Sequence, residues 1–451
     1  MRKSGNQLLR VLGLVFGVAA VVGSVIGQGI LRTPGIVAEA TGSASVIIAI
    51  WVTGALIAIV SASAFAELGA AIPRAGGVYA FIYRAFGERL AVLAAFTLLL
   101  TFIATISILA LVTGEFMLRL GIGGGAWSEV ELGVGVIALF ALLNALGTRT
   151  TGGTQILFSA LKGAMLVGLI VALFSGPPIE TVAAPQAELL RAGWLPLGTA
   201  LLVVIGTYNG WWDVVFYGEE IENPGKQIPR AVFGGIIGVA VIYLLVNLAM
   251  LHVMTPDTMA GSNLVAADAA GIVFGERADY LLTLFGVLSV GAIGNLSTMT
   301  SSRLVYALAR AQVLPELLAH VDKRGTPMPA MLFTVIAAAL IILAGGYNQL
   351  LSMGVSINQG VTVLAILAVI GLRRAEPDLE RPFRTPWYPW TIVLAAALNT
   401  VLMVIFIVQD PFYGFSGFVV VGSAWVLYVF VLKRRALLEP TEEDSRWRLP
   451  N

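Results

Sequence analysis

Long apolar runs are the feature of this sequence that most limits the folds open to it. Twelve runs have roughly the length, about 20 residues, that a helix needs to cross a bilayer. Charged residues or Pro and Gly clusters separate them, and the alternating segments typical of membrane β-barrels are missing. The sequence therefore predicts an all-α polytopic membrane protein with twelve transmembrane helices, at approximately 8–31, 44–70, 90–119, 132–147, 150–175, 195–221, 230–254, 277–310, 328–344, 349–372, 389–409 and 413–432.

The composition agrees with a lipid environment. Hydrophobic residues make up 58% of the 451 residues and charged residues 12%, against about 25% charged residues in typical globular chains. A cleaved signal peptide is the alternative for the start, because Arg2, Lys3 and Arg10 precede an apolar stretch. That stretch is long and no A-x-A-like site closes it, so we expect a first spanning helix there.

Charge balance and missing residue types exclude several classes of function. The net charge is +1, without the basic stripe of a nucleic-acid-binding protein, so no nucleic acid partner is expected. Cysteine is absent, which excludes disulfides, thiolate nucleophiles and cysteine-ligated metals. The P-loop, HExxH and GxSxG motifs are also missing from the sequence. We expect no enzyme, no cofactor, no metal site and no ATP-driven pump.

Basic residues predict the orientation, since Lys and Arg accumulate in cytoplasmic loops. Of the 27 Lys and Arg residues, four fall in predicted loops on one side, namely Arg32, Arg119, Arg191 and Arg277. Nearly all the others fall on the side that holds both chain ends. We expect an integral protein of the cell (inner) membrane with both termini in the cytoplasm.

Two of the predicted helices contain interruptions where they should lie in mid-membrane. The first holds the run GSVIGQG at 23–29, and the sixth holds GTYNGWWD at 206–213. Glycine makes departure from helical geometry easy, and the freed backbone groups need protein, water or a ligand as partners. The alternative is that small residues merely allow close helix packing. Two interruptions together favour broken helices beside a polar cavity.

The positions of the breaks predict a repeat. They fall in the first members of two consecutive five-helix blocks, which is the sequence signature of an inverted-repeat transporter site. We expect a ten-helix transport core at 1–372, with repeats at about 8–175 and 195–372. Two appended helices would follow at 373–435, and a cytoplasmic tail at 436–451.

Several motifs resemble those of one known superfamily. The segment GSVIGQGI at 23–30, followed by TPG at 33–35, is similar to a signature of the amino acid–polyamine–organocation (APC) superfamily. Later segments agree in the expected order: GGVY…FG at 76–87, EEIENP…IP at 219–229 and SR…YALAR…LP at 302–315. The resemblance covers nearly the whole chain. The L-type (LAT-like) and bacterial amino acid permease branches are the most similar.

The resemblance implies a backbone-lined substrate site. An amino acid's α-carboxylate would meet the N–H groups of Gly27, Gln28 and Gly29, where a helix N-terminus favours an anion. The α-ammonium would meet carbonyls near Ser24, Val25 and Ile26 in the first break, and near Gly206 and Asn209 in the second. Helices 3, 6, 8 and 10 would then select the side chain.

Two positions depart from the family pattern. Gln28 stands where the family usually has Ser, so its amide adds a contact or occupies space. Gly206 stands where the LAT-like branch typically has a Phe that closes over the substrate. Either the pocket is wider here, or Tyr208, Trp211 or Trp212 supplies the lid. Packing or interface anchoring is the alternative role for these three aromatic residues.

A lysine inside the fifth predicted helix is a further candidate. Lys162 would lie about 13 Å from a helix start near residue 153, too deep to reach the interface easily. By resemblance it takes the place of a sodium ion, and holds helix 1 through carbonyls near Gly23 and hydroxyls among Ser297, Thr298 and Ser301. The alternatives are a proton-carrying lysine, since burial penalises the charged form, or a lysine with structural value only.

Charged residues elsewhere are candidates for gating. Glu219, Glu220 and Glu222 can pair with Arg303 and Arg310 as an inner gate, although loop charges are usually solvated. Asp213, just beyond the second break, is a second candidate gating charge, together with Trp211 and Trp212. The stretch 256–272 is too short to span and is expected to form an outer re-entrant or amphipathic lid.

The favoured function is secondary transport of amino acids by exchange or proton symport, without sodium coupling. Transport of polyamines or other small amines is the alternative, as is a non-transporting sensor of transporter fold. A channel or an intramembrane enzyme fits less well, because neither a repeated filter nor an acid–base pair is evident. The expected partners are an amino acid substrate and the lipid bilayer, with a second copy of the chain or an accessory subunit left open.

Overall fold

The computed structural model describes residues 7–27, 29–179, 194–262, 264–345, 347–409 and 411–428. Within these residues the chain is helical, and extended pairing is limited to two isolated bridges, Leu12 with Ile221 and Ala75 with Tyr217. The helices of the first half are α1 (Leu14–Val25), α2 (Gly29–Thr41), α3 (Ala44–Ala71), α4 (Val78–Phe86), α5 (Glu88–Arg119), α6 (Glu129–Ala145) and α7 (Thr148–Phe174).

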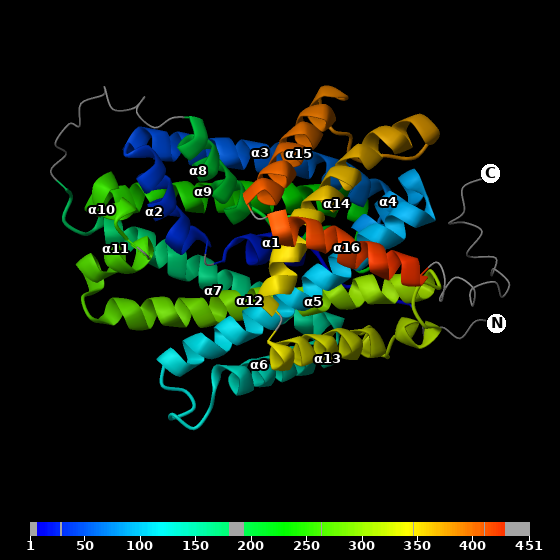
Figure 1. Cartoon of the computed structure of the whole chain (residues 1–451), viewed down its shortest axis with the longest axis horizontal. Coiled ribbons are helices and arrows are strands. Elements are labelled where there is room, and N and C mark those ends of the chain that lie inside the picture. The colour runs from blue at the N-terminus through cyan, green and yellow to red at the C-terminus, as the bar shows by residue number, and fades with distance from the viewer. Residues whose placement is uncertain are drawn as a thin grey trace.

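The second half includes several short helices between the long ones. It contains α8 (Trp194–Thr207), the 3-10 helix η2 (Asp213–Phe216), α9 (Pro224–Val253), α10 (Pro256–Ala260), α11 (Val265–Phe274), α12 (Arg277–Arg310), the 3-10 helix η3 (Glu316–Ala319), α13 (Met328–Ala344), α14 (Tyr347–Ala375), α15 (Trp390–Gln409) and α16 (Pro411–Leu427). The longest helices run roughly along the longest axis of the molecule (Figure 1).

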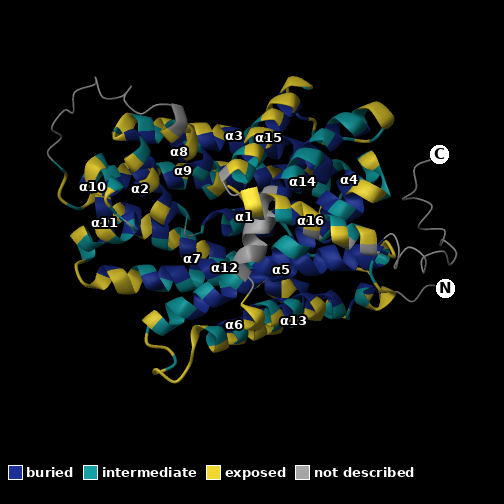
Figure 2. Ribbon diagram, in the orientation of Figure 1, coloured by how far each residue is buried: buried dark blue, intermediate teal, exposed yellow. Residues whose placement is uncertain are grey.

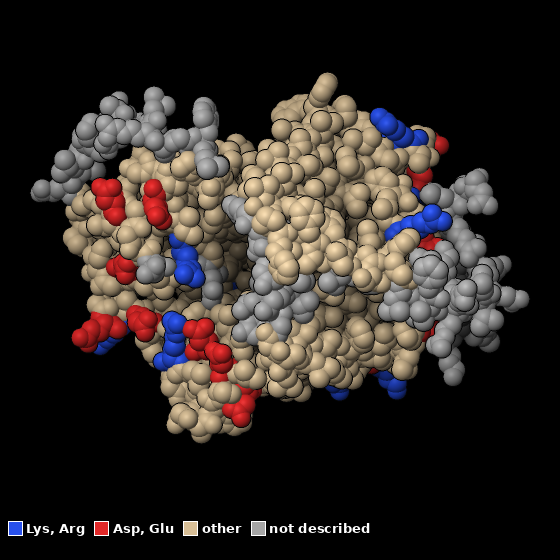
Figure 3. All heavy atoms as spheres, in the orientation of Figure 1, with Lys and Arg blue, Asp and Glu red and all other residues tan. Residues whose placement is uncertain are grey.

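Several helices are able to span a membrane. Among the described residues, seven helices are long and apolar enough, or eight if the bent pair α1 and α2 forms one span. The other predicted runs appear as helices α6, α8, α13 and α16, of 17, 14, 17 and 17 residues. Charged side chains gather toward the two ends of the molecule, with a broad uncharged surface between them (Figure 3). The chain is an integral, multi-pass membrane protein.

Helices α5 and α12 form the centre of the bundle. They pack on each other, and their buried residues contrast with the exposed outer faces of α6, α13 and α15 (Figure 2). Helix α1 packs between α7, α9 and α12, and α3 packs on α9. The interrupted first helix is therefore enclosed by long helices, which explains why Val21, Ile26 and Ile30 have no exposed surface.

Two predicted boundaries were wrong. The first run was expected at 8–31, but α2 continues to Thr41, with Pro34 inside the helix, because its buried face packs on α8 and α10. The sixth run was expected to 221, but α8 ends at Thr207 and the chain continues through turns and η2. The stretch 256–272 forms α10 and part of α11, which pack on α2.

Candidate functional site

The first helix is interrupted where the glycine-rich run predicted. Helix α1 ends at Val25, and Ile26 takes an extended backbone with ψ 100°. Helix α2 then starts at Gly29, bent by 47° from α1. Gln28 lies outside the described residues. The interruption leaves backbone N–H groups at the start of α2 and carbonyls at the end of α1 without helical partners.

The second interruption lies directly against the first. After α8 ends at Thr207, Gly210 adopts a φ of +112°, a conformation that favours glycine. A Cβ atom at Gly210 would lie 2.9 Å from the Cβ atom of Ser24 and 3.1 Å from its carbonyl oxygen. Glycine is therefore required at this position both for the turn and for the close approach of the two breaks.

Hydrogen bonds join the two breaks. The hydroxyl of Ser24 donates to a carboxylate oxygen of Asp213 across 2.8 Å. Between α2 and the last residue of α8, the hydroxyls of Thr33 and Thr207 lie 2.8 Å apart. Asp213 was predicted as a gating charge; it is buried, and its contact is to the first break. The breaks therefore form one structural unit.

Tyr243 of α9 contacts both breaks and was not found from the sequence. Its hydroxyl lies 2.8 Å from the carbonyl oxygen of Val25 and 3.5 Å from that of Thr207. The side chain is fully buried. A tyrosine in a continuous apolar helix carries no sequence signal, because packing is the usual role of such a residue.

Lys162 lies near the middle of α7 and is fully buried. Its Nζ donates to the carbonyl of Gly23 and, across 2.8 Å, to that of Ile26. The same Ile26 oxygen accepts from the hydroxyl of Ser289 on α12 across 3.0 Å. The end of α1 is thus held from two sides, by α7 and α12.

The hydroxyls of α12 that were predicted as partners of Lys162 lie farther along this helix than the hydroxyl that bonds to the break. Thr298 and Ser301 donate to carbonyls of their own helix, at Gly294 and Thr298, 2.9 and 3.1 Å away. Ser297 also lies on this later part of α12. Ser289, two to three turns earlier, is the α12 hydroxyl that bonds to the break. The predicted contacts of Lys162 with Ser297, Thr298 and Ser301 are not formed among the described residues, and Ser289 meets the lysine only through the Ile26 oxygen that both of them bond.

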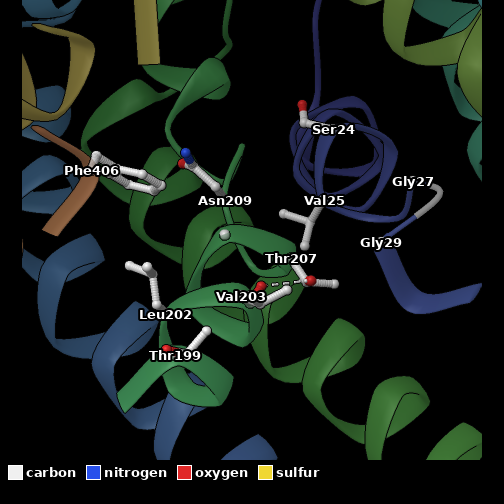
Figure 4. A pocket seen from close by; sticks show the side chains of 11 residues that line it. Ser24, Val25, Gly27, Gly29, Thr199, Leu202, Val203, Thr207, Asn209 and Phe406 are labelled. Carbon is white, nitrogen blue, oxygen red and sulfur yellow. Dashed lines mark hydrogen bonds between the residues drawn. The ribbon is translucent and has the colours of Figure 1, made fainter. Parts of the chain in front are cut away.

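A cavity of about 570 Å³ borders both breaks (Figure 4). Of the predicted binding residues, Ser24, Val25, Gly27, Gly29, Gly206 and Asn209 line it. Ile26 and Tyr208 do not, because both are buried in the protein core. The structure adds residues that the sequence had not indicated, and these are Thr199, Leu202, Val203 and Thr207 of α8 and Phe406 of α15.

The three aromatic residues considered as a lid pack away from this cavity. The Tyr208 ring packs between those of Trp51 and Tyr243, with centroids 5.8 and 5.2 Å away. Trp211 packs edge-on against Phe65.

Trp212 packs near Phe102 and Phe216, and donates to the side-chain oxygen of Asn209 across 3.1 Å. It therefore affects the cavity only through Asn209. None of the three aromatic residues is among the described residues that line the cavity. A Cβ atom at Gly206 would meet nothing within 4 Å, so the space expected from a missing Phe is present.

The charges predicted as an inner gate form two ion pairs. Arg303 and Glu220 are both buried and paired through two hydrogen bonds, of 2.8 and 2.9 Å. Thr148 of α7 donates to the same carboxylate across 3.0 Å. Arg310 pairs with Glu219 at 2.9 Å in a half-buried setting.

The chain before α1 closes over this end. Its N–H groups at Val11 and Leu12 donate to the carbonyl of Glu220, at 3.0 and 2.9 Å, and the N–H of Glu222 donates back to Leu12. The Glu222 side chain is exposed and contributes only its backbone here. Elements before α1, after η2 and on α12 therefore meet at one point.

Two interrupted membrane helices that border one cavity are typical of a class of protein, the secondary transporters. Comparison with known sequences gives the family. The sequence model of the amino acid permease family matches residues 12–432, so the chain belongs to that family, within the APC superfamily. Among the described residues no group of three or more His, Asp or Glu could hold a metal ion. The members of this family are transporters and not enzymes, and the same holds for this chain.

Characterised relatives include both bacterial and mammalian proteins. The chain is 27% identical to the serine/threonine exchanger SteT of Bacillus subtilis, over 96% of this chain and 99% of that protein. It is 30% identical to the rat b(0,+)-type amino acid transporter 1, over 88% and 83% of the two chains. It is 29% identical to the human large neutral amino acids transporter small subunit 2, over 84% and 73%.

Proposed function

We propose that this protein carries amino acids across the membrane by alternating access, as an exchanger or a proton-coupled symporter that does not use sodium. The observation that carries the proposal is the meeting of the α1–α2 break and the end of α8 on one cavity. The relatives support it, because the named proteins are amino acid transporters or exchangers. Backbone N–H and carbonyl groups at the edge of a cavity suit a zwitterion, which carries one charge of each sign.

The two ends of the substrate are assigned to different parts of the break. The carboxylate binds the N–H groups at Gly27 and Gly29, with Gln28 between them. The ammonium binds toward the carbonyls of Ser24, Val25 and Ile26, and toward Gly206 and Asn209. A carbonyl oxygen has two lone pairs, so the Val25 oxygen can accept from Tyr243 and from the substrate together. Asp213, bonded to Ser24, places a carboxyl group behind this end.

Lys162 is proposed to stand in place of a coupling sodium ion. Its ammonium has three donors, and two of them bond the carbonyls of Gly23 and Ile26. These oxygens would otherwise be available to a cation. A lysine held by two carbonyls at the end of α1 acts as a fixed brace for that helix, which supports exchange over proton symport.

The inner ion pairs are proposed to act as a gate. Glu220 with Arg303, and Glu219 with Arg310, join the segment after η2 to α12. The outer side of the cavity is bordered by α8 and α15 instead. Alternating access then requires the inner pairs to separate when the cavity opens toward the cytoplasm. Asp213, Trp211 and Trp212 would move with the η2 segment.

The architecture proposed for the whole chain keeps twelve spans. The ten-helix core at 1–372 comprises two inverted repeats, about 8–175 and 195–372, followed by two appended helices at 373–435 and a tail at 436–451. The distribution of Lys and Arg supports cytoplasmic termini in a cell membrane. An accessory subunit is a reasonable partner, because one relative is named as the small subunit of a transporter.

Transport in liposomes tests the proposal. The purified protein is reconstituted, and uptake of labelled serine, threonine, leucine and lysine is measured with and without unlabelled amino acid inside. We expect uptake that needs internal amino acid and that is unchanged when choline replaces sodium. A proton gradient that drives net uptake into empty vesicles selects symport.

Three results contradict the proposal. Sodium-stimulated uptake overturns the coupling assignment. Uptake of labelled putrescine but of no amino acid selects the amine carrier. Specific binding without any uptake selects the sensor.

A further inference from the structure

We propose that Phe406, on α15, sets the upper size limit of the substrate side chain. This inference rests on the proposed function, since it concerns the same cavity. Phe406 is the aromatic residue among the described residues that line the cavity. In Figure 4 its ring projects from α15 toward Asn209, across the cavity from Val25 and Gly29.

The division of the cavity gives Phe406 its role. One wall consists of the two breaks, which offer the backbone groups that match the charged ends of an amino acid. A substrate held there extends its side chain toward the other lining residues, which include Leu202 and Val203 of α8 and the Phe406 ring. The apolar part of this wall, formed by Leu202, Val203 and Phe406, selects by size and shape.

Gly206 determines how much of this space is free. Apart from its chain neighbours and the backbone of its own helix, no atom lies within 4 Å of the position where its Cβ would be. A residue with a large side chain at position 206 would therefore extend into the cavity that Phe406 borders. The two positions control one volume from opposite elements, α8 and α15.

A buried polar network fixes the rotation of α15. The side-chain oxygen of Asn399 accepts from Gln359 of α14 across 2.6 Å, and its nitrogen donates to Ser61 of α3 across 2.9 Å. Asn399 lies seven residues before Phe406, so both are on the same face of the helix. Hydrogen bonds that anchor Asn399 to α3 and α14 thereby direct Phe406 toward the interior and the cavity.

The test uses two single variants and their combination. Phe406→Ala enlarges the cavity, and Gly206→Phe fills it. Each is reconstituted in liposomes that contain unlabelled serine, and kcat/KM is measured for labelled alanine, serine, leucine, phenylalanine and tryptophan. Phe415→Ala on α16 is the matched control, because this phenylalanine side chain is 64% exposed.

We expect Phe406→Ala to raise the ratio of tryptophan to alanine uptake by about tenfold, and Gly206→Phe to lower it by a similar factor. The double variant should return close to the wild-type ratio, since one ring replaces the other in the same space. Phe406→Leu, a smaller change in volume, should shift the ratio in the same direction as Phe406→Ala. It also serves as the readout if the alanine variant does not insert.

The outcomes separate this inference from the proposed function. An active Phe406→Ala or Phe406→Leu variant with the ratios of Phe415→Ala overturns the role of Phe406 and leaves amino acid transport intact. A double variant with the same ratio as Gly206→Phe alone also overturns it, because removal of the Phe406 ring would then add no space for the substrate. If the wild type takes up none of the five amino acids, the proposed function itself fails.

Discussion

The hydroxyl of Tyr243 lies 2.8 Å from the carbonyl oxygen of Val25, at the last residue of α1. The same hydroxyl is 3.5 Å from the carbonyl oxygen of Thr207, at the last residue of α8. One side chain on α9 therefore contacts the ends of both interrupted helices. A hydroxyl has a single proton, so it cannot donate fully to both carbonyls at once. The shorter contact marks the bond to α1 as the stronger one in this conformation.

Tyr243→Phe removes this hydroxyl and keeps the ring. We expect transport to fall by about tenfold, which corresponds to the loss of one buried hydrogen bond of roughly 1–3 kcal/mol. The ring packing with Trp51 and Tyr208 should preserve folding. Exchange rates in liposomes measure the effect. Tyr280→Phe is the control, because Tyr280 is 60% exposed, and equal rates for the two variants would contradict the assignment.

Lys162→Ala should abolish or severely reduce transport. The substitution leaves the carbonyls of Gly23 and Ile26 without their lysine partner, and each lost bond costs about 1–3 kcal/mol. Helix α1 would then lose its link to α7 at the break, and only the bond from the hydroxyl of Ser159 to the carbonyl of Ala19, one turn earlier, would still join the two helices. Lys226→Ala is the matched control, since this lysine is exposed in the first turn of α9. Full exchange activity in Lys162→Ala, measured at fixed pH with and without sodium, would sink the assignment.

Gly29→Val should prevent substrate binding. A Cβ atom there would lie 2.8 Å from the Cγ2 atom of Thr207 and 3.0 Å from its hydroxyl oxygen. The added atoms push α2 from α8 and disturb the bond between Thr33 and Thr207. They also restrict the backbone that faces the substrate. Binding affinity, measured by calorimetry with the exchanged amino acid, should drop below detection.

Two comparisons make the Gly29 result specific. Gly27→Val should be milder in packing, because its Cβ meets only the flexible end of Ile293, at 3.2 Å, yet it should also impair binding. Gly168→Val on the exposed face of α7 meets nothing within 4 Å and should bind normally. Wild-type affinity in both Gly27→Val and Gly29→Val would place the binding site elsewhere.

Arg303→Met should destabilise the protein strongly. It leaves the buried carboxylate of Glu220 without its cation, a loss of about 3–5 kcal/mol. The double variant Arg303→Met with Glu220→Gln should regain much of this stability while losing the inner gate. Arg119→Met is the control, because its pair with Glu115 is about half exposed and contributes roughly 0–1 kcal/mol.

Thermal unfolding in detergent measures the stability of the Arg303 series, and uptake into vesicles without internal amino acid measures the gate. An Arg303→Met protein as stable as Arg119→Met would rule out a structural ion pair. A double variant that retains strict exchange would show that the pair does not control access.

The sequence predicted candidate site residues wherever a residue type is unusual for the apolar run that contains it. Three glycines and two polar side chains in the run 23–29 cannot continue an apolar helix without cost, and the break lies there. Lys162 stood out as a charge in an apolar run, and the resemblance to the family gave Gly23 as a partner, to which it bonds. Glu220 and Arg303 were matched by charge, and they pair.

The functional residues that were not predicted from the sequence are of types that are common in apolar helices. Tyr243, Phe406 and Ser289 are ordinary members of apolar helices, and their importance depends on the rotation and depth of α9, α15 and α12. Each step of one residue along a helix rotates the direction of the side chain by about 100°. The sequence of a single helix therefore does not determine which of its faces lies against the break. For this reason the hydroxyl of α12 was predicted at 297–301 and is found at Ser289.

By itself the sequence determined the environment and the local geometry. Its apolar runs require lipid around long helices, because unpaired backbone groups cannot be placed in hydrocarbon. Its glycines permit the two breaks. The tertiary structure alone decided which further side chains, from helices far apart in the chain, meet those breaks or line their cavity: Ser289, Tyr243 and Phe406. The physical reason is that such contacts depend on the packing of whole helices, a property of the assembled bundle and of no single segment.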